Sequence, residues 1–178
     1  KLLDKLEATK LAYSLPVLLD EQIEMALELR KAGLGLLGNI IGDKKAVACI
    51  EDTAVAVPDL ANYILEFTQI MAKYDQEAVY YAHAGAGELH LRPILNLKIR
   101  EDVVLFRKIT EDVAVLVKKY RGSMSGEHGD GRLRGEFIKL MVGEKNYSVM
   151  EEVKAIFDPN NIFNPGKIID TAPMDTSL

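Results

Sequence analysis

Apolar residues recur at helical spacing over several stretches of this chain. After Pro58, which suits the first turn of a helix, they fall every three or four residues, at Leu60, Tyr63, Ile64, Phe67, Ile70 and Met71. Such a stripe covers one face of a sheet, so its aromatic and methionine side chains are expected in the core. Similar apolar stripes or helix-favouring sequence predict further helices over residues 21–31, 99–120, 134–142 and 146–157.

Short apolar runs between these helices predict strands. Residues 46–50 alternate little, which suits a strand buried on both faces. Residues 79–82 and 89–95 flank a glycine-bearing turn at 84–87 and predict a hairpin, and a short strand is expected at 123–126. This order of elements favours an α+β fold with helices packed on one face of an antiparallel sheet.

A stretch at residues 33–38 matches the pattern G-x-G-x-x-G. A dinucleotide-binding loop with this pattern follows a strand and opens a helix. Here the stretch follows a helix that begins after Asp20, a suitable N-cap, and is expected to stop at Gly33. We interpret it as a flexible apolar connector.

Composition excludes several classes of protein. A net charge of −5 makes nucleic acid an unexpected partner, and no apolar run reaches the roughly 20 residues of a transmembrane segment. The single cysteine, Cys49, excludes an internal disulfide and favours the cytoplasm, with peripheral membrane attachment as an alternative. The chain begins at Lys1 without methionine, so it is expected to be part of a larger protein.

All three histidines lie in glycine-bearing stretches beside predicted strand ends. With 84–87 as the hairpin loop, His83 and His90 share one face of the sheet, roughly 7–8 Å apart at the backbone. A register shift of one residue would place them on opposite faces. The third histidine, His128, follows Glu127.

Two imidazoles and a carboxylate are suitable ligands for zinc, manganese, iron or cobalt. We therefore predict a metal site formed by His83, His90 and Glu127, with positions left open for a substrate. In an extended segment His128 would point away from Glu127, so it is better placed as a general base. The alternative is that these histidines are ordinary hydrogen-bonded residues.

Three ordered motifs carry a resemblance to a known family. They are His83-x6-His90, Ser125-Gly-Glu-His-Gly-Asp-Gly131 and Phe157-Asp-Pro-Asn-Asn-Ile-Phe-Asn-Pro-Gly-Lys167. Together they resemble the C-terminal domain of FAD-linked oxidases, the group of D-lactate, glycolate and D-2-hydroxyglutarate dehydrogenases. The segments Glu51–Val55 and Leu91–Pro93 are similar to large bacterial members that also carry an iron–sulfur region.

The resemblance implies a single ferredoxin-like domain over residues 1–178, with a helical lead-in at 1–45 and its core at 46–169. Such a domain caps an N-terminal FAD-binding domain, which is not visible in this chain. The isolated chain should therefore not bind FAD tightly or turn over. An iron–sulfur electron-transfer region is a further partner that the resemblance suggests.

The resemblance also implies roles for individual residues. His83, His90 and Glu127 would hold a divalent metal (zinc, manganese or iron) that grips a D-2-hydroxy acid. His128 would remove the hydroxyl proton while the α-hydride passes to FAD.

Two further residues are candidates for binding. Asn164 would contact the flavin, and Arg92, which shares the face of His90, could hold a second substrate carboxylate or be a solvated strand arginine. The alternative functions are a small metal-dependent hydrolase and a non-catalytic metal-binding or interaction module.

Overall fold

The computed structural model describes residues 1–176 and 178, and the chain forms two compact units, Lys1–Ile40 and Ile41–Leu178. The first unit contains helices α1 (Leu2–Thr9) and α2 (Glu21–Gly38). The prediction of a helix end at Gly33 and a flexible connector at 33–38 was wrong, because α2 continues through that stretch. A glycine costs a helix only about 1 kcal/mol, and the leucines between these glycines favour helix.

The second unit is built around an antiparallel sheet whose central strand is β4 (Glu88–Leu95). Strand β3 (Ala78–His83) pairs with one edge of β4. Strands β1 (Lys45–Ala46) and β2 (Ile50–Ala54) pair with the other edge, at opposite ends of β4. The strand predicted at 46–50 is therefore two strands, separated by a short irregular segment that contains the buried Cys49.

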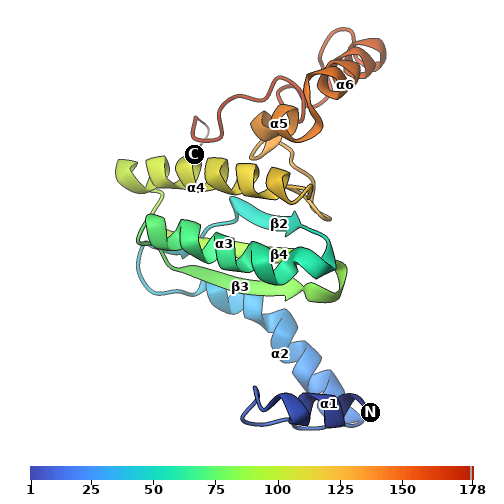
Figure 1. Ribbon diagram of the computed structural model, residues 1–178. Helices are drawn as coiled ribbons and strands as arrows, with labels where there is room; N and C mark the ends of the chain where they lie inside the picture. The colour runs from blue at the N-terminus through green and yellow to red at the C-terminus, as the bar shows by residue number, and fades with distance from the viewer. Residues whose placement is uncertain (177) are drawn as a thin grey trace. The chain divides into compact units, whose positions relative to one another are not determined.

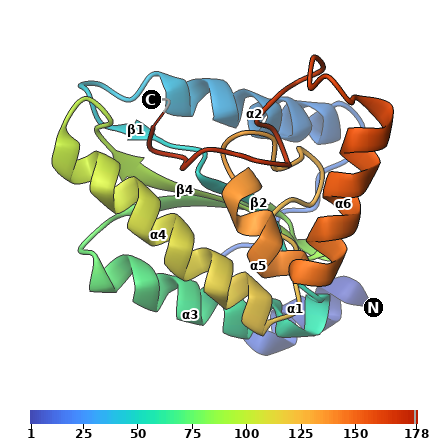
Figure 2. The same cartoon turned by 90° about the horizontal axis from the view of Figure 1, so that it is seen from above.

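Two helices cover one face of this sheet (Figures 1 and 2). Helix α3 (Leu60–Lys73) follows the 3-10 turn η1 (Val57–Asp59), and helix α4 (Arg100–Lys119) follows β4. The predicted apolar stripe of α3 is confirmed in that Tyr63, Phe67 and Met71 are buried. They pack into one core with residues of α4 and the sheet, including Ile50, Leu89, Leu91, Ile109 and Val113.

The predicted α+β class is confirmed, and the order β2-α3-β3-β4-α4 follows the start of a ferredoxin-like βαββαβ unit. The predicted strand at 123–126 does not form. Only Ser123 pairs, in an isolated bridge with Ala54 of β2, because the Ser125 hydroxyl and the N–H of Gly126 bond Asp52 instead of continuing a ladder.

The C-terminal part of the unit contains two more helices. The 3-10 turn η3 (Gly135–Phe137) leads into α5 (Ile138–Val142), and α6 (Glu144–Phe157) follows. Ile138, Tyr147 and Ile169 form a second, smaller core in this part. Among the described residues, no helix combines the length and the apolar character needed to cross a bilayer.

Candidate functional site

The predicted site residues of the hairpin lie on the face of the sheet that points away from α3 and α4. His90 pairs with Tyr81 of β3 and with Glu51 of β2, and His83 pairs with Glu88. Residues directly opposite in an antiparallel pair share a face. The hairpin register predicted from the turn at 84–87 is therefore confirmed, and both histidines lie on the same face.

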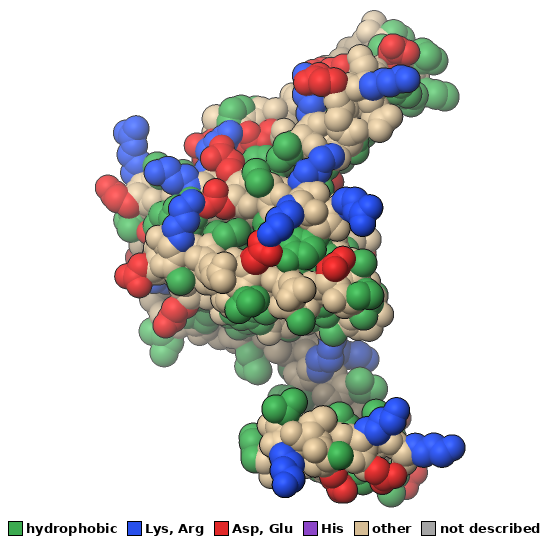
Figure 3. Space-filling view, viewed as in Figure 1, with side chains coloured by type: hydrophobic (Ala, Val, Ile, Leu, Met, Phe, Trp, Pro, Cys, Tyr) green, Lys and Arg blue, Asp and Glu red, His purple; other side chains and the backbone are tan. Residues whose placement is uncertain are grey.

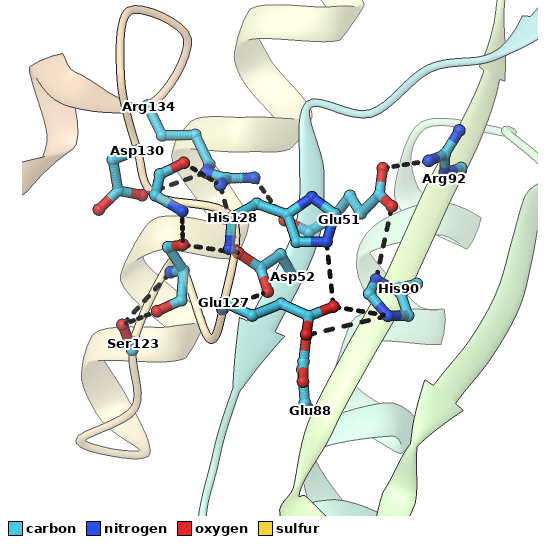
Figure 4. A network of polar contacts seen from close by, with 12 residues as sticks. Glu51, Asp52, Glu88, His90, Arg92, Ser123, Glu127, His128, Asp130 and Arg134 are labelled. Atoms are coloured by element: carbon cyan, nitrogen blue, oxygen red, sulfur yellow. Dashed lines mark hydrogen bonds and ion pairs between the residues drawn. The ribbon is translucent and has the colours of Figure 1, made fainter. Parts of the chain in front are cut away.

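The three predicted metal ligands come together in space. The Nε2 atoms of His83 and His90 lie 4.0 Å and 3.9 Å from Oε1 of Glu127. The two imidazole rings are 5.3 Å apart between centroids, and the three ligand atoms lie within 4.8 Å of one another. Figure 4 shows Glu127 reaching from its loop toward His90 on β4.

The chemistry of this group fits a divalent metal. Ligand atoms around a tetrahedral ion at about 2.1 Å lie about 3.4 Å apart, so small side-chain movements would bring the three into place. Burial lowers the pKa of His90, which keeps its ring neutral, the form that binds metals. Two further ligand sets overlap with this one. The first is Glu51 with His90 and His128, and the second is Asp52 with Glu127 and His128.

His128 lies beside Glu127 rather than on an opposite face. Its Nε2 atom is 3.0 Å from Oε1 of Glu127, and its side chain is 52% exposed. The prediction that His128 points away from Glu127 holds for an extended segment, but residues 126–128 form bends, so neighbouring side chains need not alternate. His128 is thus accessible and close to the candidate ligands, with its ring 5.8 Å from that of His90.

Three buried acidic residues complete the site, and none of them was predicted from the sequence as a site residue. Asp52 is fully buried, and Glu51 and Glu88 are nearly so. The one sequence signal was a pair of acids directly after an apolar strand. Their burial depends on partners far along the chain, which no local pattern reveals.

The pKa values of two of these acids, Glu88 and Asp52, are shifted in opposite directions. Burial, the neighbouring Asp52 carboxylate and the charge of Glu127 raise the pKa of Glu88 to about 7. For Asp52, burial acts to raise the pKa, but bonds from the Ser125 hydroxyl and from the N–H groups of His128 and Glu127 lower it to about 2. Several carboxylates grouped beside imidazoles form an environment that favours a cation.

Arg92 points to Glu51 across the same face. Its Nη2 atom forms an ion pair with Oε2 of Glu51, and its side chain is only 15% exposed. Its Nε atom is buried and has no hydrogen-bond partner among the described residues. A guanidinium carries five N–H donors, so the ion pair leaves others for a further acceptor.

Asn164 lies elsewhere on the unit, on a surface groove of about 730 Å³ that is lined by α6 and the C-terminal segment. A second hollow of about 510 Å³ is lined by the loop that carries Glu127. The two share Met150 and Ile168, so they adjoin. Hydrophobic side chains gather at the outer end of α6 beside the groove, where Phe157 and Phe163 are exposed (Figure 3).

A comparison with known families shows the family to which this fold belongs. The chain belongs to the family "FAD linked oxidases, C-terminal domain", whose model matches residues 3–168. The resemblance inferred from the three motifs is therefore confirmed.

Individual relatives have related names. The chain is 37% identical over 156 residues to D-2-hydroxyglutarate dehydrogenase of Escherichia coli (strain K12), covering 88% of this chain and 15% of that protein. It is 31% identical over 128 residues to D-lactate dehydrogenase of Archaeoglobus fulgidus, covering 72% and 28%. It is 28% identical over 149 residues to glycolate oxidase subunit GlcD of Bacillus subtilis (strain 168), covering 84% and 31%. The chain thus spans between 15% and 31% of the length of these relatives.

Proposed function

We propose that this domain binds the substrate and a divalent metal in a flavin-dependent enzyme that oxidises a D-2-hydroxy acid to the 2-oxo acid. The observation that carries the proposal is the convergence of His83, His90 and Glu127 on one face of the sheet. The family and the names of the relatives support a hydroxy acid as substrate class. We place the enzyme in the cytoplasm, because this domain has a single cysteine and so no internal disulfide.

The three ligands would hold zinc, manganese or iron. Such a metal supplies Lewis-acid polarisation of the bound hydroxyl, which lowers its pKa. His83 and Glu127 are each about half exposed, while His90 is buried. The ligands therefore leave one side of the site open, and this side is available to the carboxylate and hydroxyl of the substrate.

His128 serves as the general base in this proposal. Oxidation of a 2-hydroxy acid removes a proton from oxygen and a hydride from the α-carbon, leaving a carbonyl. The half-exposed imidazole of His128 takes the proton, because histidine is the side chain that most often serves as a general base. FAD, held mainly by a separate FAD-binding domain, supplies the hydride acceptor.

Arg92 and Asn164 have supporting roles in the proposal. One edge of the Arg92 guanidinium holds Glu51, and its other donors can bind a second carboxylate of the substrate. Asn164 would contact the flavin from the groove beside α6, which adjoins the hollow at Glu127. An iron–sulfur electron-transfer region is a further proposed partner of the domain.

A metal titration tests the core of this proposal. Chelator-treated chain should bind zinc or manganese with near one-to-one stoichiometry in calorimetry, and alanine at His83, His90 or Glu127 should abolish binding. The exposed Glu144→Ala is a matched control, because Glu144 forms a surface ion pair with Lys139 and is not one of the candidate ligands. Retained affinity in all three ligand variants would contradict the site.

The two alternatives from the sequence have less support. A metal hydrolase would need no flavin, and ester or amide hydrolysis by the isolated chain would favour it. A non-catalytic module would bind a partner tightly without any response to metal. Neither gains support from the family or from the names of the relatives.

A further inference from the structure

Two consecutive acids of β2, Glu51 and Asp52, both serve the site. In a regular strand, neighbouring side chains point to opposite faces. Here the pairing with β4 shifts register between Glu51 and Thr53, and Asp52 has a positive φ of 80°. These are the features of a β-bulge, which inserts one residue into a strand and often lies next to an active site.

The bulge keeps the rest of β2 in its normal packing. Ile50, before it, is fully buried in the core. Thr53, after it, accepts a hydrogen bond from the Tyr63 hydroxyl of α3 at 3.0 Å. Both flanking side chains thus face the helices, and the extra residue allows Glu51 and Asp52 to contact the site together.

Asp52 holds the loop that carries Glu127 and His128. Its carboxylate accepts hydrogen bonds from the Ser125 hydroxyl at 2.6 Å and from the N–H groups of Glu127 at 2.8 Å and His128 at 2.9 Å. Its carbonyl oxygen accepts from the N–H of Gly126 at 2.7 Å. Four consecutive loop residues are therefore bound to one side chain and its backbone (Figure 4).

Glu51 holds the other half of the site. Its Oε1 atom lies 3.5 Å from Nδ1 of His90 and accepts a hydrogen bond from the Tyr81 hydroxyl at 3.1 Å. Arg92 engages its second oxygen. Tyr81 also stacks on the His90 ring at 4.6 Å between centroids, so the ring is fixed from two directions.

His90 needs such a partner if it binds through Nε2. A neutral imidazole that ligates through Nε2 carries its proton on Nδ1, and metal-binding histidines usually donate that proton to a carboxylate or carbonyl. Nδ1 of His90 is buried and has no hydrogen-bond partner among the described residues. The Glu51 carboxylate at 3.5 Å is positioned to accept it after a small movement.

We propose that the bulge at Asp52 makes Glu51 and Asp52 a pair of positioning residues, Glu51 for the His90 ring and Asp52 for the loop bearing Glu127 and His128. Arg134 links the two halves, since its buried guanidinium donates to the carbonyl oxygens of Glu51 and Gly129. The inference rests on the proposed function for its metal-binding part only. The ordering of the loop by Asp52 does not depend on any bound metal.

The metal-binding part is tested with near-isosteric variants of the full chain. Zinc or manganese titration should show that Glu51→Gln and Asp52→Asn each weaken binding by about 10–100-fold, the usual effect of removing such outer partners. Tyr81→Phe and Ser125→Ala each remove one bond to these acids while leaving β2 intact, and should weaken binding by a smaller factor. They keep the test informative if a β2 variant does not fold.

Two matched controls separate positioning from general stability. Asp158 caps a loop through the N–H groups of Ile162 and Phe163, much as Asp52 does, and Glu136 pairs with Arg107 as Glu51 pairs with Arg92. Asp158→Asn and Glu136→Gln should lower the free energy of unfolding without changing metal affinity. An equal loss of affinity in these controls would show a merely structural role and overturn the inference.

Hydrogen exchange on metal-free chain tests the Asp52 half separately. The amides of Glu127 and His128 should exchange faster in Asp52→Asn than in wild type, with core amides of α4 unchanged. If wild-type chain binds no metal, the proposed function fails while this result still decides the role of Asp52. If wild type binds metal and both acid variants bind equally well, the inference fails while the proposed function stands.

Discussion

At the scale of single residues, His128 differs from His90 in what its ring can do. Its side chain is half exposed and touches Oε1 of Glu127, whereas His90 is enclosed by Tyr81 and Glu51. A base must reach the substrate and exchange its proton with solvent, which an exposed ring allows. A ligand is better held in place.

His128→Ala should therefore remove the base while keeping the metal. In the full-length protein, reduction of the flavin by a D-2-hydroxy acid should slow by about 10²–10⁴-fold, the usual contribution of general base catalysis. Stopped-flow absorbance of the flavin measures the rate, and metal analysis of the same sample serves as control. A wild-type rate would contradict the proposed role, and loss of metal would show that His128 is a ligand.

Asn164 offers a second test at this scale, because its backbone has a positive φ of 50°. Glycine adopts such angles freely, so Asn164→Gly removes the side chain without backbone strain. In the full-length protein, FAD affinity should fall by about 2–10-fold, equivalent to one hydrogen bond. Asn161→Gly is the matched control, since Asn161 also has a φ of 50° but does not line the groove. Equal FAD affinity in both variants would exclude the contact.

Part of the site could be predicted from single residues. The approach of His83 to His90 follows from the turn length, and Glu127 was expected nearby because its segment resembled a strand end. Glu51 and Asp52 could not be found, since acids after an apolar run usually mark a turn. Partners distant in sequence make them parts of the site, because the loop at 125–128 bonds Asp52 while Tyr81 and Arg92 hold Glu51.

At the scale of elements, the β3–β4 hairpin depends on Gly87. Its φ is 76°, and a Cβ atom there would lie 2.0 Å from the carbonyl oxygen of Val55. The carbonyl oxygen of Gly87 in turn accepts the N–H of Val55 at 3.0 Å. This close approach connects the turn to the end of β2, so the turn is part of the sheet's packing.

Gly87→Ala should lower the free energy of unfolding by at least about 1–2 kcal/mol, the cost of a left-handed conformation for an L residue, with the clash adding to it. Urea denaturation followed by circular dichroism measures the change. Gly85→Ala, in the same turn, has no heavy atom within 4 Å of its Cβ and no positive φ. Its effect should stay within about 0.5 kcal/mol. Equal effects would contradict the close packing at Gly87.

The elements themselves were predicted where local pattern decides them. Helices α3 and α4 and the hairpin have strong periodicity, and each was confirmed within a few residues. The wrong predictions fell in segments where the tendencies toward two different structures are nearly balanced. Helix α2 continued through glycines whose cost its leucines offset. Ser125 and Gly126 bonded to Asp52 rather than pairing with β2 as a strand.

At the scale of the whole molecule, the candidate ligands join segments that are distant in sequence. His83 and His90 belong to the hairpin, whereas Glu127 follows α4. A bound metal would therefore link the sheet to the loop at 125–128 and add stability to the folded unit.

Metal addition should stabilise the chain by mass action. At a concentration about 100 times the Kd, zinc or manganese should raise the free energy of unfolding by about 2.7 kcal/mol, and a chelator should reverse the gain. Urea denaturation with and without metal measures this. His83→Ala should show no gain, and a gain equal to that of wild type in this variant would place the metal elsewhere.

The turn at 84–87 also constrains how this domain can vary in length. Side chains alternate along a strand, so one residue added within β3 next to the turn would rotate one imidazole toward the helices while the fold survived. Two added residues would restore its direction. Insertions and deletions in this hairpin should therefore contain an even number of residues in relatives that keep the chemistry. Relatives in which the number is odd should be inactive.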